Sequence, residues 1–460
     1  MFGAACGVVM KLRIFDKINN YKKSDPLRLH MPGHKGKAKL FGGAESFDIT
    51  EVEDLKIEQE VAKAETDLAK VYGVRHLKML TGGSTVGVLA MMAAAKKYGD
   101  KIVILRQSHK SVFNALNLFG LEPIIVGGES FDGLYEFPDE DCIIKAAGDK
   151  SVSGVLLTYP DYYGRVFDVK SIYKRLKQAG KKLFLDAAHG AHLPFCGAGE
   201  FIGFCDACVM STHKTLCSLN SGALLIANDE LEKEVFSAAD VLSTTSPSYL
   251  ILSSAEYGVK RAAACKKTNG KKAAALEGLK AMLKNLGFTV IKNDDPFKIA
   301  IDFEASGISA KKAAKELEKQ GVFFELNDNK RILFMFSFET SAADIERFYR
   351  AIKNTAALKK NIKTEADIRP LKGATVKVAT SEKRERVVSY LVAVNSNKQE
   401  TPLKMAEGKI CAENFGTFPP CYPVCIAGER ITRSDIEQIK KKSAFGVYNG
   451  KVLTVNDNEG

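Results

Sequence analysis

The sequence has no long hydrophobic run. None of its apolar stretches approaches the roughly 20 residues that a helix needs to cross a bilayer. The first ten residues are apolar, but they lack the basic start and the long apolar core of a secretory signal. We therefore expect no membrane partner and a cytoplasmic location.

Cysteine is too dispersed for a disulfide-stapled fold, with 10 cysteines in 460 residues. Cys205 and Cys208 form a Cys-x-x-Cys, with Cys196 and Cys217 nearby, but no second Cys-x-x-Cys follows. The residues at 206–210 are typical of a buried strand. Small buried thiols therefore explain these cysteines better than zinc does, and we expect no metal site.

The charge balance is basic, with a net charge of +12 and a pI of about 9.0. A nucleic-acid partner is the first interpretation of such a balance. The lysines, however, are scattered in short runs without interleaved aromatic residues, and they have acidic neighbours on predicted helices. A solvated surface explains them better, and we expect no nucleic-acid partner.

Repeats and low-complexity segments are absent as well, and between about residues 60 and 240 predicted helices and strands alternate. The strands are short, continuous apolar runs, as at 101–106, 154–158 and 182–186. Such runs are typical of a sheet that is buried on both faces. The intervening helices predict an α/β fold with a mainly parallel sheet, which binds ligands at the carboxyl ends of its strands.

The pattern divides the chain into four predicted parts. An N-terminal segment covers 1–45, and the major domain covers 46–287, ending in a long helical stretch at about 253–286. Residues 288–370 follow the order strand, strand, helix, strand, strand, helix, which predicts a smaller α+β domain. A C-terminal region follows at 371–460, and the total length suits two or three domains.

One predicted strand leads into a turn rich in glycine and hydroxyl groups, Thr81-Gly82-Gly83-Ser84-Thr85, which opens a helix. Glycines let the backbone approach an anion, and the helix N-terminus and the two hydroxyls can hold it. Similar turns also serve only as helix caps. This one lacks the lysine of a P-loop and the third glycine of a dinucleotide fingerprint.

Two charged residues follow buried strands. Asp186 ends the strand at 182–186, where an acid either caps a turn or pairs with a buried cationic nitrogen. Lys214 follows the next strand, within Ser211-Thr212-His213-Lys214. Desolvation at such a position lowers the pKa of a lysine and makes its amine nucleophilic.

Together these features predict a site for pyridoxal phosphate (PLP). The phosphate of that cofactor needs a helix N-terminus with hydroxyls, its pyridine nitrogen needs an acid, and its aldehyde needs a lysine for a Schiff base. Each feature alone is a weak signal. The ordered set of anion turn, aspartate and Ser-x-His-Lys is much more specific.

At these motifs the sequence resembles the Orn/Lys/Arg decarboxylase family of fold-type-I PLP enzymes, in particular its shorter bacterial members. The resemblance extends from about Leu27 to Glu429. The matching stretches are His30-Met31-Pro32-Gly33-His34-Lys35-Gly36, Asp48-Ile49-Thr50-Glu51, Gly83-Ser84-Thr85, Ser108-His109-Lys110-Ser111, Asp186-Ala187-Ala188-His189-Gly190-Ala191-His192, Ser211-Thr212-His213-Lys214, Thr244-Thr245-Ser246-Pro247-Ser248-Tyr249 and, in the tail, Phe418-Pro419-Pro420-Cys421-Tyr422-Pro423 through Gly428-Glu429.

The resemblance implies a role for each matching residue. Lys214 would carry the cofactor, and Asp186 would pair with the pyridinium. His109 would stack on the ring, and His189 would lie near its phenolic oxygen. Lys214 or His213 would return a proton to the substrate's Cα. The residues implied in holding the phosphate are Gly83, Ser84, Thr85, Ser211 and His213.

The resemblance also implies an assembly. Fold-type-I sites lie at a dimer interface, so the segment 244–249, and Thr245 in particular, would reach the site of a partner subunit. We therefore expect a homodimer or a higher homo-oligomer. The chain lacks the N-terminal wing domain of the long, acid-induced members, so a large decamer is not expected.

The chain departs from the family pattern in two places. Tyr159 and Asp161 stand in a loop where the family often has Asn and Thr, which can alter what lies beside the cofactor. In the tail, Cys421 replaces a glycine and Ala427 a proline, which puts the geometry of that element in question.

The implied reaction is the decarboxylation of a basic amino acid, with arginine favoured over lysine and ornithine. The candidates for contacting the substrate are His34, Glu51, Asp161 and Glu429. One alternative is another fold-type-I activity, such as that of an aminotransferase or a lyase. A second is a PLP-binding protein without activity, which the retained Asp186, His109 and Lys214 argue against.

Overall fold

The computed structural model describes residues 10–129, 134–359, 384–418, 421–440 and 443–456. Three features of the sequence lie outside these residues: the apolar residues 1–9, the predicted boundary at 370, and Pro419-Pro420 of the tail motif. Within the described residues, no helix is both long and apolar enough to cross a membrane.

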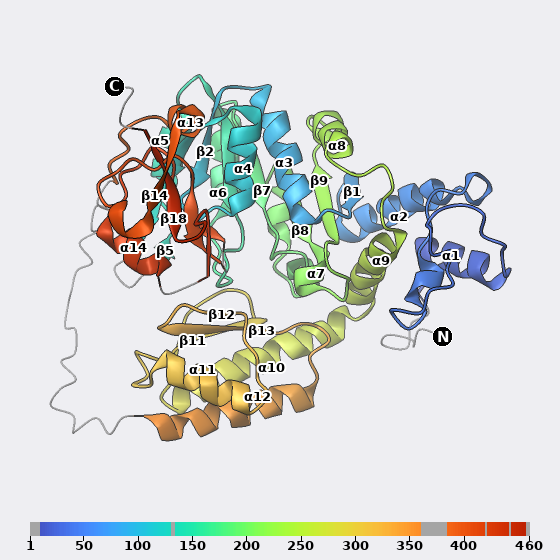
Figure 1. Cartoon of the computed structure of the whole chain (residues 1–460). Coiled ribbons are helices and arrows are strands. Elements are labelled where there is room, and N and C mark those ends of the chain that lie inside the picture. Colours follow the sequence, from blue (N-terminus) through green and yellow to red (C-terminus); the bar gives the residue numbers. More distant parts are fainter. Residues whose placement is uncertain (1–9, 130–133, 360–383, 419–420, 441–442, 457–460) are drawn as a thin grey trace.

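A seven-stranded sheet forms the centre of the major domain (Figure 1). Strand β9 runs antiparallel to both of its neighbours, β1 and β8, whereas the other neighbouring pairs are parallel. The predicted mainly parallel sheet is therefore confirmed. In sheet order the strands are β1 (His76–Leu80), β9 (Ala223–Ala227), β8 (Ala207–Ser211), β7 (Lys182–Asp186), β6 (Val152–Thr158), β2 (Lys101–Leu105) and β3 (Glu122–Val126).

Helices cover both faces of this sheet, because its strands are apolar on both sides. In β9, for example, Leu224 packs into one buried layer and its neighbour Leu225 into the other. The layer of Leu225 contains α3 (Gly83–Lys96), α4 (Lys110–Phe119) and α8 (Glu232–Val241). The layer of Leu224 contains α1 (Arg13–Lys23), α2 (Ile57–Tyr72), α5 (Glu140–Ala147), α6 (Val169–Gln178) and α9 (Tyr249–Ala264).

The long helical stretch expected at 253–286 is two helices. The first, α9, already begins at Tyr249, and α10 spans Lys266–Asn285. Cys265 separates them and stands outside the helical region, with φ −99° and ψ 16°. Figure 1 shows α10 running from the major domain into the smaller one, so this junction joins the two.

The smaller domain has the predicted order of elements: β10 (Thr289–Val290), β11 (Lys298–Asp302), α11 (Ala310–Lys319), β12 (Leu326–Asn327), β13 (Arg331–Met335) and α12 (Ala342–Thr355). Its four strands form an antiparallel sheet in the order β10-β11-β13-β12. The N-terminus of α12 is closed by a capping box between Ser341 and Asp344, a pattern that the sequence carries locally.

The C-terminal region packs against the edge of the main sheet beside β3 and α4 (Figure 1). Tyr390 is fully buried there, and its hydroxyl donates to the carbonyl of Phe113 in α4 at 3.2 Å. The elements of this region are α13 (Tyr390–Asn395), β14 (Lys398–Pro402), β15 (Phe415–Thr417), β16 (Tyr422–Cys425), α14 (Arg433–Ile439), β17 (Ala444–Phe445) and β18 (Lys451–Val455).

Candidate active site

The strand order brings the predicted charged residues to one edge of the sheet. Strands β6, β7 and β8 are parallel neighbours, so their carboxyl ends lie together. Asp186 is the last residue of β7 and Ser211 the last of β8. Lys214 lies in the single turn α7 (Thr212–Thr215) that follows β8 directly.

Lys214 lies beside a buried histidine. Its Nζ is 3.5 Å from Nε2 of His189, which follows β7. Burial lowers the pKa of the Lys214 amine, against the opposing charges of Asp186 and Glu325. A lysine with a lowered pKa has a larger fraction of neutral, nucleophilic amine near pH 7 than an exposed one.

His189 is almost fully buried, and burial together with the charges of Lys298 and Lys214 holds its pKa well below the usual range. The imidazole is therefore neutral near pH 7. Tyr162 packs its ring edge to face against His189, with the ring centroids 5.1 Å apart. A neutral imidazole adds no positive charge beside Lys214, so it does not lower the pKa of the amine further.

His109 is the N-cap residue of α4. Its Nδ1 accepts the backbone N–H of Ser111 at 3.2 Å, which places the ring proton on Nε2. Burial lowers the pKa of His109, Asp186 raises it and Lys214 lowers it. These three predicted residues therefore act on one another in a single site.

The predicted anion turn is connected by hydrogen bonds to the turn that contains Lys214. Helix α3 begins at Gly83, whose φ of 69° lies in the left-handed region that glycine adopts without strain. The backbone N–H of Gly83 donates to Ser221 O at 2.8 Å, and that of Thr212 donates to Gly222 O at 2.9 Å. One turn, at Ser221 and Gly222, thus joins the start of α3 to the start of the lysine turn.

The anion-binding groups fit a phosphate. No side chain caps the N-terminus of α3, and Ser84 there is half-buried, whereas Thr85 is exposed. The Oγ of Ser211 is fully buried and has no hydrogen-bond partner among the described residues. A buried hydroxyl without a partner is uncommon, and a ligand oxygen would satisfy it. His213 completes the set, with its Nδ1 at 3.0 Å from the carbonyl of Gly222.

Two of the predicted substrate carboxylates are engaged inside the protein. Asp161 is buried, and its two oxygens accept the backbone N–H and the Nε of Arg165 at 2.8 and 2.7 Å. Glu429 is buried too, and its two oxygens accept Nη1 and Nη2 of Arg106 at 2.6 and 2.8 Å. Neither carboxylate is available for a substrate cation unless its arginine is released.

The other predicted contacts come from surface segments. The Nε2–H of His34 donates to Asp48 at 3.2 Å, while its Nδ1 accepts the N–H of Gly36. Glu51 is exposed and interacts with Tyr249. Thr245 is exposed as well. Within the described residues, none of these three makes a hydrogen bond or an ion pair with Lys214.

Three residues near Lys214 were not predicted. Glu325, just before β12, receives a hydrogen bond from the hydroxyl of Tyr162. Lys298, at the start of β11, is buried and donates from Nζ to the carbonyls of Asp161 and Tyr162, both at 3.2 Å. No local motif marks either residue, because each reaches the site only through the packing of the smaller domain on the loop after β6.

The third unpredicted neighbour is the thiol of Cys421, whose electrostatic partners include Lys214. Cys421 has φ 63°, and its carbonyl accepts the N–H of Lys110 at 3.1 Å. A left-handed backbone explains why relatives can have glycine here. Cys421 adds a side chain beside Lys214 that a glycine would not have.

The cysteines suspected of binding zinc do not gather into a metal site. Cys205 and Cys208 are buried free thiols, while Cys196 and Cys217 are partly exposed. Among the described residues, no group of three or more His, Cys, Asp or Glu side chains could hold a metal ion.

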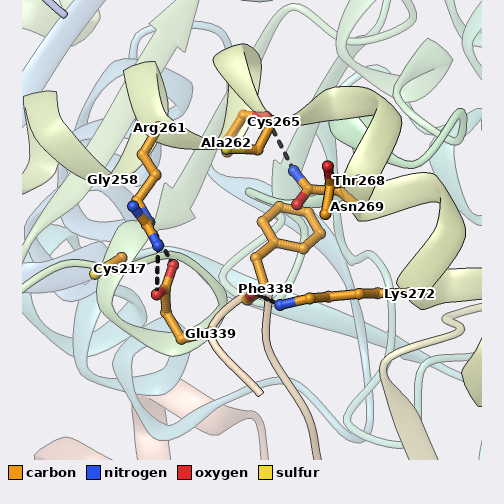
Figure 2. A pocket seen from close by; sticks show the side chains of 10 residues that line it. All are labelled: Cys217, Gly258, Arg261, Ala262, Cys265, Thr268, Asn269, Lys272, Phe338 and Glu339. Atoms are coloured by element: carbon orange, nitrogen blue, oxygen red, sulfur yellow. Dashed lines mark hydrogen bonds and ion pairs between the residues drawn. The ribbon is translucent and has the colours of Figure 1, made fainter. Parts of the chain in front are cut away.

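A cavity of about 90 Å³ lies elsewhere, at the junction of α9 and α10 with the smaller domain (Figure 2). Its polar side chains are bound to one another or to the backbone. Arg261 pairs with both oxygens of Glu339 at 2.6 and 2.8 Å, and Asn269 donates to the carbonyl of Ala262 at 2.9 Å. No predicted site residue lines this cavity, which is a structural joint between the domains.

Comparison with known proteins places this chain in a family. The family described as Orn/Lys/Arg decarboxylase, major domain, matches residues 14–285, which is more than half of the chain. The chain therefore belongs to the Orn/Lys/Arg decarboxylase family, and it is an amino-acid decarboxylase by that membership.

Relatives of similar length support the assignment over almost the whole chain. Arginine decarboxylases of Bacillus anthracis and Bacillus subtilis (strain 168) are each 27% identical to it, over 94% of this chain and 93% and 94% of theirs. The structure of the constitutive lysine decarboxylase of E. coli is similar in fold, with a TM-score of 0.75 and 18% identity over 97% of this chain and 82% of that one. Lysine decarboxylase A of Pseudomonas aeruginosa gives a TM-score of 0.79 at 15% identity, over 96% of this chain and 80% of that one.

Proposed function

We propose that the protein is a PLP-dependent decarboxylase of basic amino acids, with arginine as the favoured substrate and Lys214 as the residue that binds the cofactor. The observation that carries the proposal is the convergence of Lys214, Asp186 and His109 at the carboxyl edge of the sheet. The buried amine of Lys214, whose pKa is lowered, and the aspartate at a strand end are the lysine and the acid that this cofactor requires, and the charges of both act on His109. Arginine is favoured because two of the full-length relatives are named arginine decarboxylases.

Different residues would bind the phosphate and the pyridine ring of the cofactor. The N–H groups at the start of α3, with Ser84 and the buried hydroxyl of Ser211, would hold the phosphate. Asp186 would keep the proton on the pyridine nitrogen. When bound, PLP supplies a sink for the electron pair that remains on Cα after CO₂ leaves.

We further propose that the active protein is a homodimer in the cytoplasm, and that Thr245 acts in the site of the partner subunit. Thr245 is exposed, which is consistent with a role outside its own chain. The N-terminal segment also exposes large apolar side chains that a second subunit would cover. These are Leu27, Leu29, Met31, Leu40 and Phe41, each between 64% and 83% exposed.

The test of the proposed function is a product screen. Purified protein saturated with PLP is incubated separately with arginine, lysine, ornithine, glutamate and leucine, and the released CO₂ and amines are measured. We expect turnover of at least one basic amino acid, with arginine first. Turnover of glutamate or leucine without turnover of the three basic amino acids would refute the proposed substrate class.

A further inference from the structure

The active site contains a carboxylate that no sequence motif indicates. The hydroxyl of Tyr162 donates to Oε1 of Glu325, and the ring of Tyr162 packs against His189, which lies 3.5 Å from Lys214. These contacts connect Glu325, in the smaller domain, to the predicted catalytic amine in the major domain. Consistent with this closeness, the negative charge of Glu325 acts on both Lys214 and Lys298.

Glu325 differs from the other acids near the site because its carboxylate is still accessible. Asp161 and Glu429 each use both oxygens on an arginine. Glu325 is exposed, and within the described part of the chain its Oε2 makes no hydrogen bond. A substrate cation can therefore reach one oxygen of Glu325 without breaking an internal ion pair.

The position of Glu325 is held from both sides. Its backbone N–H donates to Leu333 O at 3.0 Å, which attaches it to strand β13. Tyr162 is in turn held by Lys298, whose Nζ donates to the Tyr162 carbonyl at 3.2 Å. A carboxylate fixed in this way can recognise a charge at a set distance from Lys214, whereas one on a freely moving side chain cannot.

A local acid is also what a cationic substrate requires here. The chain has a net charge of +12, so its long-range field repels a cation, although salt screens that field beyond about 10 Å. We propose that Glu325, oriented by Tyr162, binds the distal guanidinium or ammonium group of the substrate and thereby determines the preference for basic amino acids. This inference rests on the proposed function.

The test compares wild type with Glu325→Gln, which keeps an oxygen acceptor for Tyr162 and removes only the charge. Steady-state kinetics are measured with arginine and with citrulline, its uncharged analogue, and PLP content is measured by absorbance. We expect KM for arginine to rise about 10- to 100-fold, because a charge-assisted hydrogen bond is lost. KM for citrulline should change less than about threefold, because its uncharged ureido group forms no ion pair with the carboxylate and can still donate to the glutamine oxygen.

The matched control is Glu318→Gln, which removes the same charge from an exposed position on α11 of the same domain. Its KM for arginine should stay at the wild-type value. Equal increases of KM for arginine and citrulline in Glu325→Gln, or no increase for either, would overturn the inference. If Glu325→Gln does not retain PLP, Glu325→Asp replaces it. Its shorter carboxylate should raise KM for arginine more than KM for citrulline, and an unchanged ratio of the two KM values would overturn the inference equally.

Calorimetric binding of arginine to the PLP-loaded wild type and to Glu325→Gln separates this inference from the proposed function, because it needs no turnover. A wild type that binds arginine at least tenfold more tightly than the variant does, but releases no CO₂ from it, would refute the proposed function and support the role of Glu325. Turnover of arginine with equal binding to both proteins would refute the role of Glu325 alone.

Discussion

Neutralising Glu429 should loosen the C-terminal region rather than weaken substrate binding. Its side chain is 4% exposed and that of Arg106 is 8% exposed, and two hydrogen bonds of 2.6 and 2.8 Å join them. Removing one partner of such a buried pair costs about 3–5 kcal/mol, because the other charge remains buried without compensation. At about 1.4 kcal/mol for each factor of ten, Glu429→Gln should make local opening of residues 424–430 at least about 100-fold more frequent.

Hydrogen exchange measures this opening directly. The backbone N–H of Ile426 donates to Oε2 of Glu429 at 3.0 Å, so its protection should fall by about that factor. The matched control is Glu400→Gln, which breaks an exposed ion pair with Lys451 and should cost less than about 1 kcal/mol. Unchanged protection of Ile426 together with a large increase of KM for arginine would refute the structural role and restore Glu429 as a substrate residue.

The same pair has a defined pH dependence. Burial opposes ionisation of Glu429, but the hydrogen bonds and charge of Arg106, the backbone N–H of Ile426 and the charge of Arg384 together outweigh burial and lower the pKa of its carboxyl. A carboxyl with a lowered folded-state pKa contributes its stability above the unfolded value of about 4.3, and that stability is lost as the pH falls below this value and through the folded pKa. Protection of Ile426 should therefore fall with acid in wild type but not in Glu429→Gln. Replacing both partners, as in Arg106→Met with Glu429→Gln, should lower the free energy of local opening by less than the sum of the two single replacements.

Two further predictions concern the catalytic residues. Asp186→Asn should still bind PLP, as measured by absorbance, but its kcat should fall at least about 100-fold. The reason is that an amide cannot hold the ring-nitrogen proton as a carboxylate does. Near-normal turnover would show that another acid serves this role. Mixing Lys214→Ala subunits with inactive Thr245→Arg subunits should restore part of the activity, because one site of each heterodimer would have both intact residues. Verified heterodimers without activity would contradict the shared site.

The main elements of the site could be predicted because they depend on short stretches of sequence. Asp186 and Lys214 follow buried strands, and the carboxyl ends of parallel strands meet at one edge. The turn at Gly83 was likewise predictable, because its glycines and hydroxyl residues stand together in the sequence. The break of the long helical stretch at Cys265 was harder to predict from the sequence, because both halves favour helix and the break depends on the junction with the smaller domain.

Pairing across long separations could not be predicted. Arg106 and Glu429 are 323 residues apart, and no local pattern shows that they bind one another. Glu325 reaches the site only because the smaller domain packs on the loop that contains Tyr162, so it has no motif of its own. The ion pair of Asp161 with Arg165, in contrast, could have been predicted from the sequence, because an acid and an arginine four residues apart in one loop can form one.

Lys214 is the residue proposed to bind the cofactor, and borohydride trapping tests that role most directly. Protein with bound PLP is reduced, digested and analysed by mass spectrometry, which locates the lysine that has gained the pyridoxyl group. Lys298 is an internal competitor, since burial lowers the pKa of its amine as well, but its Nζ already donates to two carbonyls. We predict the label on Lys214. A label on Lys298 or on another lysine, or no label at all, would contradict the account.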